Sequence, residues 1–365
     1  MALGADIVID VHAPFPFVRQ GVILDEHHRD ALIDAGVHAV YVKDELSDGI
    51  KISRALSEET RQAAASALVT AFITAPTLLA RGARLPGSSL SDLNEAAGMI
   101  CADIADADDA VLALSDLAAA DAYTMQHSID VAAVGVMIGR RHFRDHGRPT
   151  ATGPRRTDDV EGYLRKLGVG LLLHDIGKLA VPESILNKPG PLDREEMDLM
   201  RMHPQFGLEL VPGDTIGPLA KVVIRSHHER WNGTGYPHGI AGSDIHEFAR
   251  IAAIADVFDA ITSARPYAEP AATHVGVSAI LQGSGSLYDP LIVESFRKVV
   301  APFPPGSEID LTDGRRGIVV SVPPRQLDLP LVRVAYGPDG ERIELEELDL
   351  REHPQLVPPL AVAAA

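Results

Sequence analysis

The sequence predicts a mainly α-helical protein with a small α/β unit at its N-terminus and a small β module at its C-terminus. Three observations predict this fold class. Short β-branched runs surround one helical pattern at the start of the chain, and a long succession of Ala- and Leu-rich helical patterns follows up to Val300. Near the end, the segments RRGIVVSV, LVRVAY and RIELEEL alternate apolar and polar residues with the period of a β-strand.

The N-terminal α/β unit is expected over residues 1–56. The runs DIVIDV and HAVYV flank the helical pattern DEHHRDALIDAG, in which Gly36 is typical of a helix C-cap. The pattern predicts a ββαβ unit.

A helical connecting region is expected over residues 57–116. Ser57 precedes an Ala-rich helical run as an N-cap, and this run stops at RGARLPGSS. A second helix is expected from Ser91 to about Leu114. The first of these helices is also a candidate for pairing with a second copy of the chain, although folding onto the neighbouring helices explains it equally well.

The remaining chain divides into a helical domain, a β module and a tail. Gly-Pro segments such as NKPGPLD and VPGDTIGP separate the helical patterns of residues 117–302. Residues 303–352 contain the three alternating segments, with GPDG as a turn, and residues 353–365 form the tail.

Composition limits the function classes. A chain of 365 residues with 46% hydrophobic content can bury a sizeable core, and its net charge of -18 argues against binding to a nucleic acid polymer. The single cysteine, Cys101, excludes an intramolecular disulfide and favours a reducing compartment. The N-terminal residues MALGADIVIDVHAPF lack the pattern of a signal peptide, and no apolar stretch of about 18 uncharged residues is expected. These features predict a cytoplasmic protein with no membrane partner.

The chemistry is concentrated in the central helical region, where histidines and aspartates occur at the ends of apolar helical patterns. A single histidine of this kind is usually a hydrogen-bonded core residue. A set of seven imidazoles and carboxylates is instead typical of a site for Mn, Fe, Ni or Zn. The candidates are His127, His174, Asp175, His203, His227, His228 and Asp256.

The adjacent pair His174-Asp175 suggests two metals. Neighbouring side chains on a helix point about 100° apart and do not easily chelate one ion. Asp175 has two oxygens and is the natural bridging ligand. Lys178, four residues after His174, offers an ammonium group to a phosphate oxygen, and the alternative is a solvated surface lysine.

Three separated motifs carry a family resemblance. HDIGK, HHERWNGTGYP and ADVFDAITSARPY occur in this order, and the chain from about Asp121 to Val300 resembles the HD-GYP family of cyclic di-GMP phosphodiesterases. The N-terminal unit is similar to a small domain that often precedes HD-GYP domains. The resemblance implies an HD-type helical bundle.

The resemblance also implies roles for individual residues. It makes the seven candidates metal ligands, with Asp175 bridging the metals and Asp259 orienting a ligand. Lys178 would contact the scissile phosphate and Arg265 another phosphate. The loop with Gly235, Tyr236 and Pro237 would lie beside the substrate pocket, where Trp231 either stacks on a guanine or packs within the loop.

Two positions depart from the family pattern. Members with three metals carry a glutamate four residues before the first histidine, where this chain has Tyr123, so two metals are expected. Many members carry Lys or Arg where this chain has Ala268, which removes one expected phosphate contact.

The expected function is therefore metal-dependent hydrolysis of cyclic di-GMP to linear pGpG, with onward cleavage to GMP left open. The expected nucleophile is a hydroxide bridging two ions, with Fe or Mn favoured and Ni or Zn open. The alternatives are a non-catalytic cyclic di-GMP sensor or protein-interaction module on the same fold, and an HD phosphohydrolase for another nucleotide.

Overall fold

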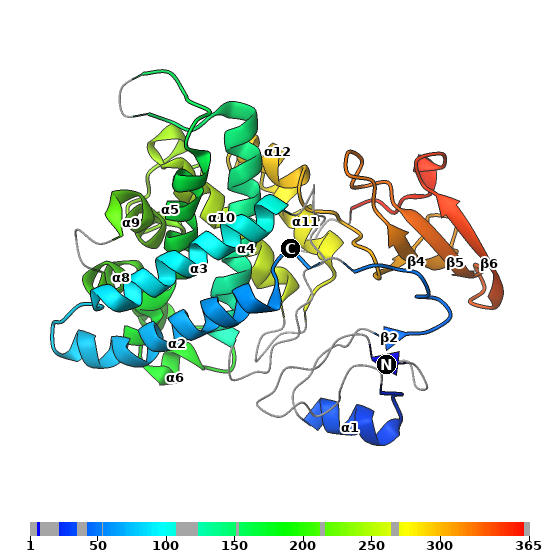
Figure 1. Ribbon diagram of the computed structural model, residues 1–365, viewed down its shortest axis with the longest axis horizontal. Helices are drawn as coiled ribbons and strands as arrows, with labels where there is room; N and C mark the ends of the chain where they lie inside the picture. Colours follow the sequence, from blue (N-terminus) through cyan, green and yellow to red (C-terminus); the bar gives the residue numbers. More distant parts are fainter. Residues whose placement is uncertain are drawn as a thin grey trace.

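The computed structural model describes residues 6–7, 22–34, 42–52, 54–106, 123–150, 153–211, 216–263 and 270–360. Most of these residues form a helical bundle, and a four-stranded antiparallel sheet lies at one side of it (Figure 1). A short strand pair and one helix precede the bundle. The predicted fold class, mainly α with a C-terminal β module, is confirmed, whereas the exact domain boundaries remain a prediction.

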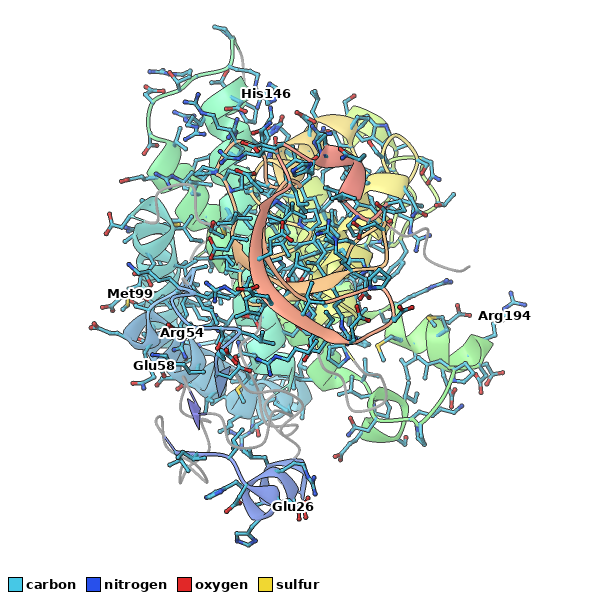
Figure 2. All side chains as sticks on the ribbon, turned by 90° about the vertical axis from the view of Figure 1, so that its right-hand side faces the viewer. Glu26, Arg54, Glu58, Met99, His146 and Arg194 are labelled. Carbon is cyan, nitrogen blue, oxygen red and sulfur yellow. The ribbon has the colours of Figure 1, made fainter. Side chains whose placement is uncertain are left out.

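The bundle begins with three long helices, and most of the helices that follow are shorter. Its α-helices are α2 (Glu58–Ala80), α3 (Gly87–Asp106), α4 (Tyr123–His146), α5 (Val160–Leu172), α6 (Glu183–Leu186), α7 (Arg194–Met200), α8 (His203–Leu210), α9 (Gly217–Ser226), α10 (Glu247–Thr262), α11 (Thr273–Gln282) and α12 (Pro290–Arg297). Its 3-10 helices are η2 (Ile176–Ala180) and η3 (Gly242–Asp244). In the perpendicular view of Figure 2, His146 at the end of α4 and Glu26 lie at opposite ends of the molecule.

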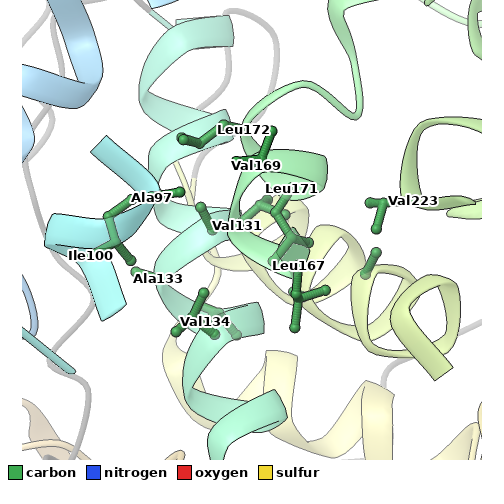
Figure 3. Packing of buried hydrophobic residues seen from close by; sticks show 14 of the residues in the cluster. Ala97, Ile100, Val131, Ala133, Val134, Leu167, Val169, Leu171, Leu172 and Val223 are labelled. Atoms are coloured by element: carbon green, nitrogen blue, oxygen red, sulfur yellow. The ribbon is translucent and has the colours of Figure 1, made fainter. Parts of the chain in front are cut away.

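The core lies where α3, α4, α5 and α9 meet. Figure 3 shows Ala97, Val134, Leu171 and Val223 converging from these four helices, and all four are buried. A Cβ atom at Gly135 would lie 2.5 Å from Leu171 Cδ1, so glycine lets α4 approach α5 closely. The helices that carry the candidate site residues are therefore held by a dense apolar interior.

Ser57 is the N-cap of helix α2, as predicted, and its hydroxyl accepts a hydrogen bond from the Thr60 N–H at 3.2 Å. The prediction that no apolar stretch of about 18 uncharged residues occurs is wrong, because residues 62–80 carry no charge and lie in an apolar helix. Among the described residues, α2 alone is long and apolar enough to cross a membrane by length and composition. One face of α2, including Leu68 and Phe72, is buried in the core of the bundle, which accounts for much of its apolar character.

The second predicted helix begins earlier than expected. Helix α3 starts at Gly87 instead of Ser91 and is described up to Asp106, so its predicted end near Leu114 lies outside the described residues. The segment GSS that follows Pro86 reads as a loop by composition, yet it forms the first turn of α3.

The C-terminal sheet has the order β3-β4-β5-β6, with strands β3 (Glu308–Asp310), β4 (Arg316–Ser321), β5 (Leu331–Tyr336) and β6 (Arg342–Asp349). All neighbours are antiparallel. One face buries a separate small core that includes Val319, Val332, Val334 and Leu348. The three alternating segments of the sequence are β4, β5 and β6, and η4 (Pro354–Leu356) follows them. Strand β3 is too short for its alternation to show in the sequence.

The N-terminal unit is described in part. Strand β1 (Asp6–Ile7) pairs antiparallel with β2 (Val42–Lys43), and α1 (Glu26–Asp34) lies between them in the chain. The predicted C-cap at Gly36 lies outside the described residues. After β2, the backbone oxygens of Leu46 and Asp48 accept hydrogen bonds from Arg333 at 2.7 and 2.8 Å, which ties this segment to β5.

An ion pair between the partly exposed Arg155 and the buried Glu247, at the start of α10, predicts a pH dependence of stability. The Arg155 guanidinium donates to both oxygens of Glu247, at 2.5 and 3.1 Å. Burial opposes ionisation of Glu247, but hydrogen bonds from His142 and Arg155 outweigh it and lower its pKa from 4.5 to about 2. Because the pKa of Glu247 is lower in the folded protein than in the unfolded chain, the ion pair stabilises the fold fully above about pH 4.5. This stabilisation is lost as the pH falls towards 2.

Glu247→Gln is therefore expected to lower the free energy of unfolding at neutral pH by on the order of 3 kcal/mol. The deficit should shrink below pH 4.5. Urea unfolding from pH 7 to pH 3 measures this, with the exposed Glu344→Gln as the control that changes little. A deficit independent of pH would contradict the assigned ion pair.

Candidate metal centre

His174 and Asp175 lie in the turn between α5 and η2. Both side chains are almost completely buried. The His174 Nδ1–H donates to the Leu171 backbone oxygen at 2.7 Å, which turns Nε2 into the site. The adjacent pair lies in a turn and not in an α-helix, so the expected angle of about 100° between helical side chains does not apply to it, and Lys178 follows on a 3-10 helix. The turn itself separates the two side chains.

Gly177 explains why α8 lies directly against this turn. A Cβ atom at Gly177 would lie 1.9 Å from the His203 backbone oxygen and 2.5 Å from the Gly207 nitrogen, so only glycine fits. This close approach places His203, the first residue of α8, beside Asp175. The glycine of the HDIGK motif therefore has a packing role in building the site.

The structure brings all seven candidate ligands together from five segments of the chain. They form two groups in which the candidate ligand atoms lie within 4.8 Å of one another. The first group is Asp175, His203, His227 and His228, and the second is His127, His174 and Asp256.

In the first group, two imidazole nitrogens face each other. His203 Nε2 and His227 Nε2 are 3.2 Å apart. The Nδ1–H of His203 donates to the Met200 oxygen at 2.8 Å, and that of His227 donates to the Val223 oxygen at 3.0 Å. Both rings therefore present an Nε2 lone pair to the same space when they are neutral, an arrangement that a bound cation would stabilise.

In the second group, Asp256 lies between two histidines. Its Oδ1 is 3.2 Å from His127 Nε2 and 3.8 Å from His174 Nε2. His127 Nδ1 contacts Asp259 Oδ2 at 2.6 Å. His174 Nε2 is buried and has no hydrogen-bond partner among the described residues. A buried lone pair without a donor is costly, and a metal ion would satisfy it.

Asp175 spans the two groups. Its Oδ1 lies 3.5 Å from His203 Nε2 and 3.7 Å from His227 Nε2. Its Oδ2 lies 3.4 Å from His174 Nε2 and 3.7 Å from His127 Nε2. Each oxygen thus faces one group, which is the arrangement that a bridging carboxylate requires.

The electrostatics of the groups suit metal binding. Burial lowers the pKa of His203 to about 3 and that of His228 well below its usual range, so both rings are neutral at pH 7. Burial opposes ionisation of Asp175, but Lys178 and His174 hold its pKa well below the usual range. Neutral imidazoles and ionised carboxylates are the forms that bind metals.

His127 is the exception among the histidines. Burial opposes its protonation, but hydrogen bonds to Asp256 and Asp259 outweigh that effect and raise its pKa to about 10. A metal ion at this position would therefore compete with a proton on His127.

Lys178 lies at the edge of the cluster. Its Nζ contacts Asp175 Oδ2 at 2.5 Å, and the side chain is about a quarter exposed. It is neither a solvated surface lysine nor fully enclosed. Its position next to the carboxylate that spans both groups places a positive charge beside the centre.

The loop of Gly235, Tyr236 and Pro237 folds back onto the two adjacent histidines. A Cβ atom at Gly235 would lie 2.5 Å from the His228 backbone oxygen, so glycine permits the contact. The Tyr236 N–H donates to the same oxygen at 3.2 Å, and the Tyr236 ring stacks on the His228 ring at 4.6 Å. Burial raises the pKa of Tyr236, so the phenol stays protonated. The loop thus forms one wall of the site.

The other candidate substrate-binding residues are less directly placed. The Trp231 ring lies under the Arg250 guanidinium, whose Cζ is 5.4 Å from the ring centre, and this contact favours the packing interpretation. Arg265 and Ala268 lie outside the described residues. Tyr123 is the first residue of α4, one turn before His127.

Sequence reasoning overlooked two residues at the site. Glu229 is buried, and its Oε1 accepts a hydrogen bond from the His238 N–H at 2.8 Å, so it anchors the end of the loop. Arg201 places its guanidinium over the Tyr236 ring. A carboxylate directly after two histidines was a usable signal for Glu229, whereas the contact of Arg201 joins residues distant in the chain.

The contact between Asp259 and His127 predicts an effect on metal affinity. Because the carboxylate orients the His127 ring, Asp259→Ala is expected to weaken metal binding about ten- to a hundredfold. Metal titration of the purified variant measures this. Ser263→Ala removes only the hydroxyl that donates to Asp259 Oδ1 at 2.7 Å and should have a much smaller effect. Unchanged metal affinity in Asp259→Ala would refute the orienting role.

Comparison with known proteins gives one family match. Residues 155–292 match the family described as HD domain. This range contains six of the seven candidate ligands, all except His127.

Several curated relatives are similar over longer or shorter parts of the chain. Cyclic di-GMP phosphodiesterase PA4108 of Pseudomonas aeruginosa is 35% identical over 290 residues, which cover 78% of this chain and 64% of the relative. The cyclic di-GMP phosphodiesterase response regulator RpfG of Xanthomonas campestris is 41% identical over 137 residues, or 37% of this chain and 36% of the relative. The 3'3'-cGAMP-specific phosphodiesterase 2 of Vibrio cholerae is 40% identical over 124 residues, or 33% of this chain and 24% of the relative.

The chain spans less than two thirds of the length of each of these relatives. The HD domain match and the relatives agree with the motifs HDIGK and HHERWNGTGYP. The chain therefore contains an HD domain and belongs to the HD-GYP family that its motifs resemble.

Proposed function

We propose that this chain is a metal-dependent phosphodiesterase that hydrolyses cyclic di-GMP to linear pGpG. The observation that carries the proposal is the convergence of seven buried or half-buried histidine and aspartate side chains, with the His203 and His227 Nε2 atoms 3.2 Å apart. Relatives named cyclic di-GMP phosphodiesterases support the choice of substrate. Whether the product is cleaved further to GMP is decided by the assay described below.

The donor set fits two metal ions, one in each group. Imidazole nitrogens and carboxylate oxygens without any thiolate suit Fe or Mn, and Ni or Zn also accept such ligands. Tyr123 in place of a carboxylate supports two ions instead of three. When bound, two such ions would acidify a water molecule and neutralise charge on the phosphoryl oxygens.

The residues of the chain prepare the site for this chemistry. Backbone oxygens hold the rings of His174, His203 and His227 with their Nε2 atoms directed inward. Asp175 faces both groups and keeps them in a fixed relation. The surrounding burial excludes bulk water, which strengthens every electrostatic interaction with the substrate.

Lys178 is proposed to stabilise the reacting phosphate. Its ammonium group lies at the edge of the cluster and is partly exposed, so it is within reach of a ligand that enters from solvent. Negative charge that grows on the phosphoryl oxygens would strengthen this contact in the transition state. The Tyr236 loop, beside His228, would contact the nucleotide.

A substrate panel tests the proposed function. The metal-loaded protein should hydrolyse cyclic di-GMP faster than 3'3'-cGAMP, cyclic di-AMP and linear pGpG, as followed by chromatography of the products. Accumulation of pGpG identifies a single cleavage, and GMP identifies two. Tight binding of cyclic di-GMP without turnover would instead make the chain a sensor, and preference for another nucleotide would overturn the substrate assignment.

Location and assembly are also part of the proposal. We place the enzyme in the cytoplasm, because the single cysteine favours a reducing compartment. A homodimer through the outer face of α2 is retained as a prediction that size measurement in solution would decide.

A further inference from the structure

Arg201 connects α7 with α8 and contacts the wall of the site. Its Cζ lies 5.6 Å from the centre of the Tyr236 ring, and that ring stacks on His228 at 4.6 Å. One aromatic ring thus separates the guanidinium from a candidate metal ligand. The cation–π contact also holds the guanidinium at a defined place at the edge of the site.

The charge of Arg201 is only weakly compensated. Its ion-pair partner is Asp198, at 3.8 Å, and the side chains are 53% and 63% exposed. Exposed pairs of this kind contribute little, so the guanidinium keeps most of its capacity to bind an anion. Arg155 differs, because it donates to both oxygens of the buried Glu247.

A cyclic dinucleotide carries two phosphodiester groups, and only one of them can react at the metal groups at a time. The other needs cations of its own, particularly in a chain with a net charge of -18, and the family resemblance assigns one such contact to Arg265. A guanidinium offers two parallel N–H donors that match the oxygens of a phosphodiester. Arg201 supplies such a group at the edge of the same site.

We propose that Arg201 is a substrate-binding residue that holds the phosphodiester group of cyclic di-GMP that is not being cleaved. This assignment rests on the proposed function. It makes the turn between α7 and α8 a part of the substrate site, in addition to the loop of Tyr236 and the HDIGK turn.

Arg201→Ala is expected to raise the KM for cyclic di-GMP, and the Kd measured with catalysis blocked, by about ten- to a hundredfold. The kcat should change less than about threefold, and metal content should stay the same, since Arg201 touches neither the reacting phosphate nor a metal. Arg201→Lys should restore part of the affinity because it keeps the charge but not the paired donors.

Arg201→Gln separates charge from packing. Glutamine can still cover the Tyr236 ring but is neutral, so it should bind as weakly as the alanine variant. Arg194→Ala is the matched control, because Arg194 begins the helix α7 that ends just before Arg201, and it projects at the edge of the molecule in Figure 2. It should bind cyclic di-GMP like the wild type.

The outcomes distinguish this assignment from the function on which it rests. If the wild-type enzyme is active and Arg201→Ala or Arg201→Gln binds cyclic di-GMP as tightly as the wild type does, only the role of Arg201 is overturned. A loss of kcat or of bound metal in Arg201→Ala would show that the residue supports the site structurally, and would also overturn it. A wild-type protein that neither binds nor hydrolyses cyclic di-GMP overturns the proposed function and this assignment together.

Discussion

Asp175→Ala is expected to release bound metal and to lower cyclic di-GMP hydrolysis by at least about a thousandfold. The physical reason is that each oxygen of Asp175 faces one of the two groups, at 3.4 to 3.7 Å from the histidine nitrogens. Removing it takes a ligand from both groups at once. A metal contributes several kcal/mol to stabilising a phosphoryl transition state, which corresponds to about three orders of magnitude in rate.

Two further variants control for loss of folding. Asp175→Asn keeps the shape of the side chain but not its charge and should also lose metal. Asp289→Ala removes a similarly buried carboxylate, which pairs with Arg250 away from the cluster, and should lower Tm while keeping metal and turnover. Full activity and full metal content in Asp175→Ala would rule out its bridging role.

Lys178→Ala is expected to retain the metals and to lose two to three orders of magnitude in kcat. An ammonium group is not a metal ligand, whereas it stabilises charge that grows on the phosphoryl oxygens, and the loss of one such contact costs a few kcal/mol. Bound metal, Tm and hydrolysis should be measured on one preparation.

The matched control is Lys188→Ala. Lys188 also contacts a carboxylate at 2.5 Å, that of Glu196, and it is exposed to a similar extent, but it lies outside the cluster. It should behave like the wild type in rate and metal content. If Lys178→Ala loses metal and Tm together with rate, the pair with Asp175 is structural, and an unchanged rate removes Lys178 from the mechanism.

The sequence was sufficient for the fold class and for the set of residues that meet at the centre. The pair His174-Asp175 follows the apolar helix α5, and the pair His227-His228 follows the apolar helix α9. The strands β4, β5 and β6 could also be predicted, because their alternation of apolar and polar residues is long enough to be distinct. These features depend on local patterns.

Features that depend on contacts between distant residues could not be predicted. The turn at His174 is placed against α8 by Gly177, whose lack of a side chain matters only because the His203 oxygen lies there. The contact of Arg201 with Tyr236 likewise joins two segments that share no local pattern. The uncharged stretch of α2 was not recognised in the sequence. Neutral residues on its outer face adjoin the apolar residues of its buried face, and together they form one long uncharged run.

Stepwise metal reconstitution tests most directly the claim that two bound metal ions are required for hydrolysis of cyclic di-GMP. Metal is removed with a chelator, retention of the fold is checked by circular dichroism, and Mn or Fe is returned in measured equivalents while cyclic di-GMP hydrolysis is followed. The two groups of ligands predict no turnover without metal and a rise in rate that stops at two equivalents per chain. Rapid hydrolysis of cyclic di-GMP by the folded, metal-free protein would contradict the account.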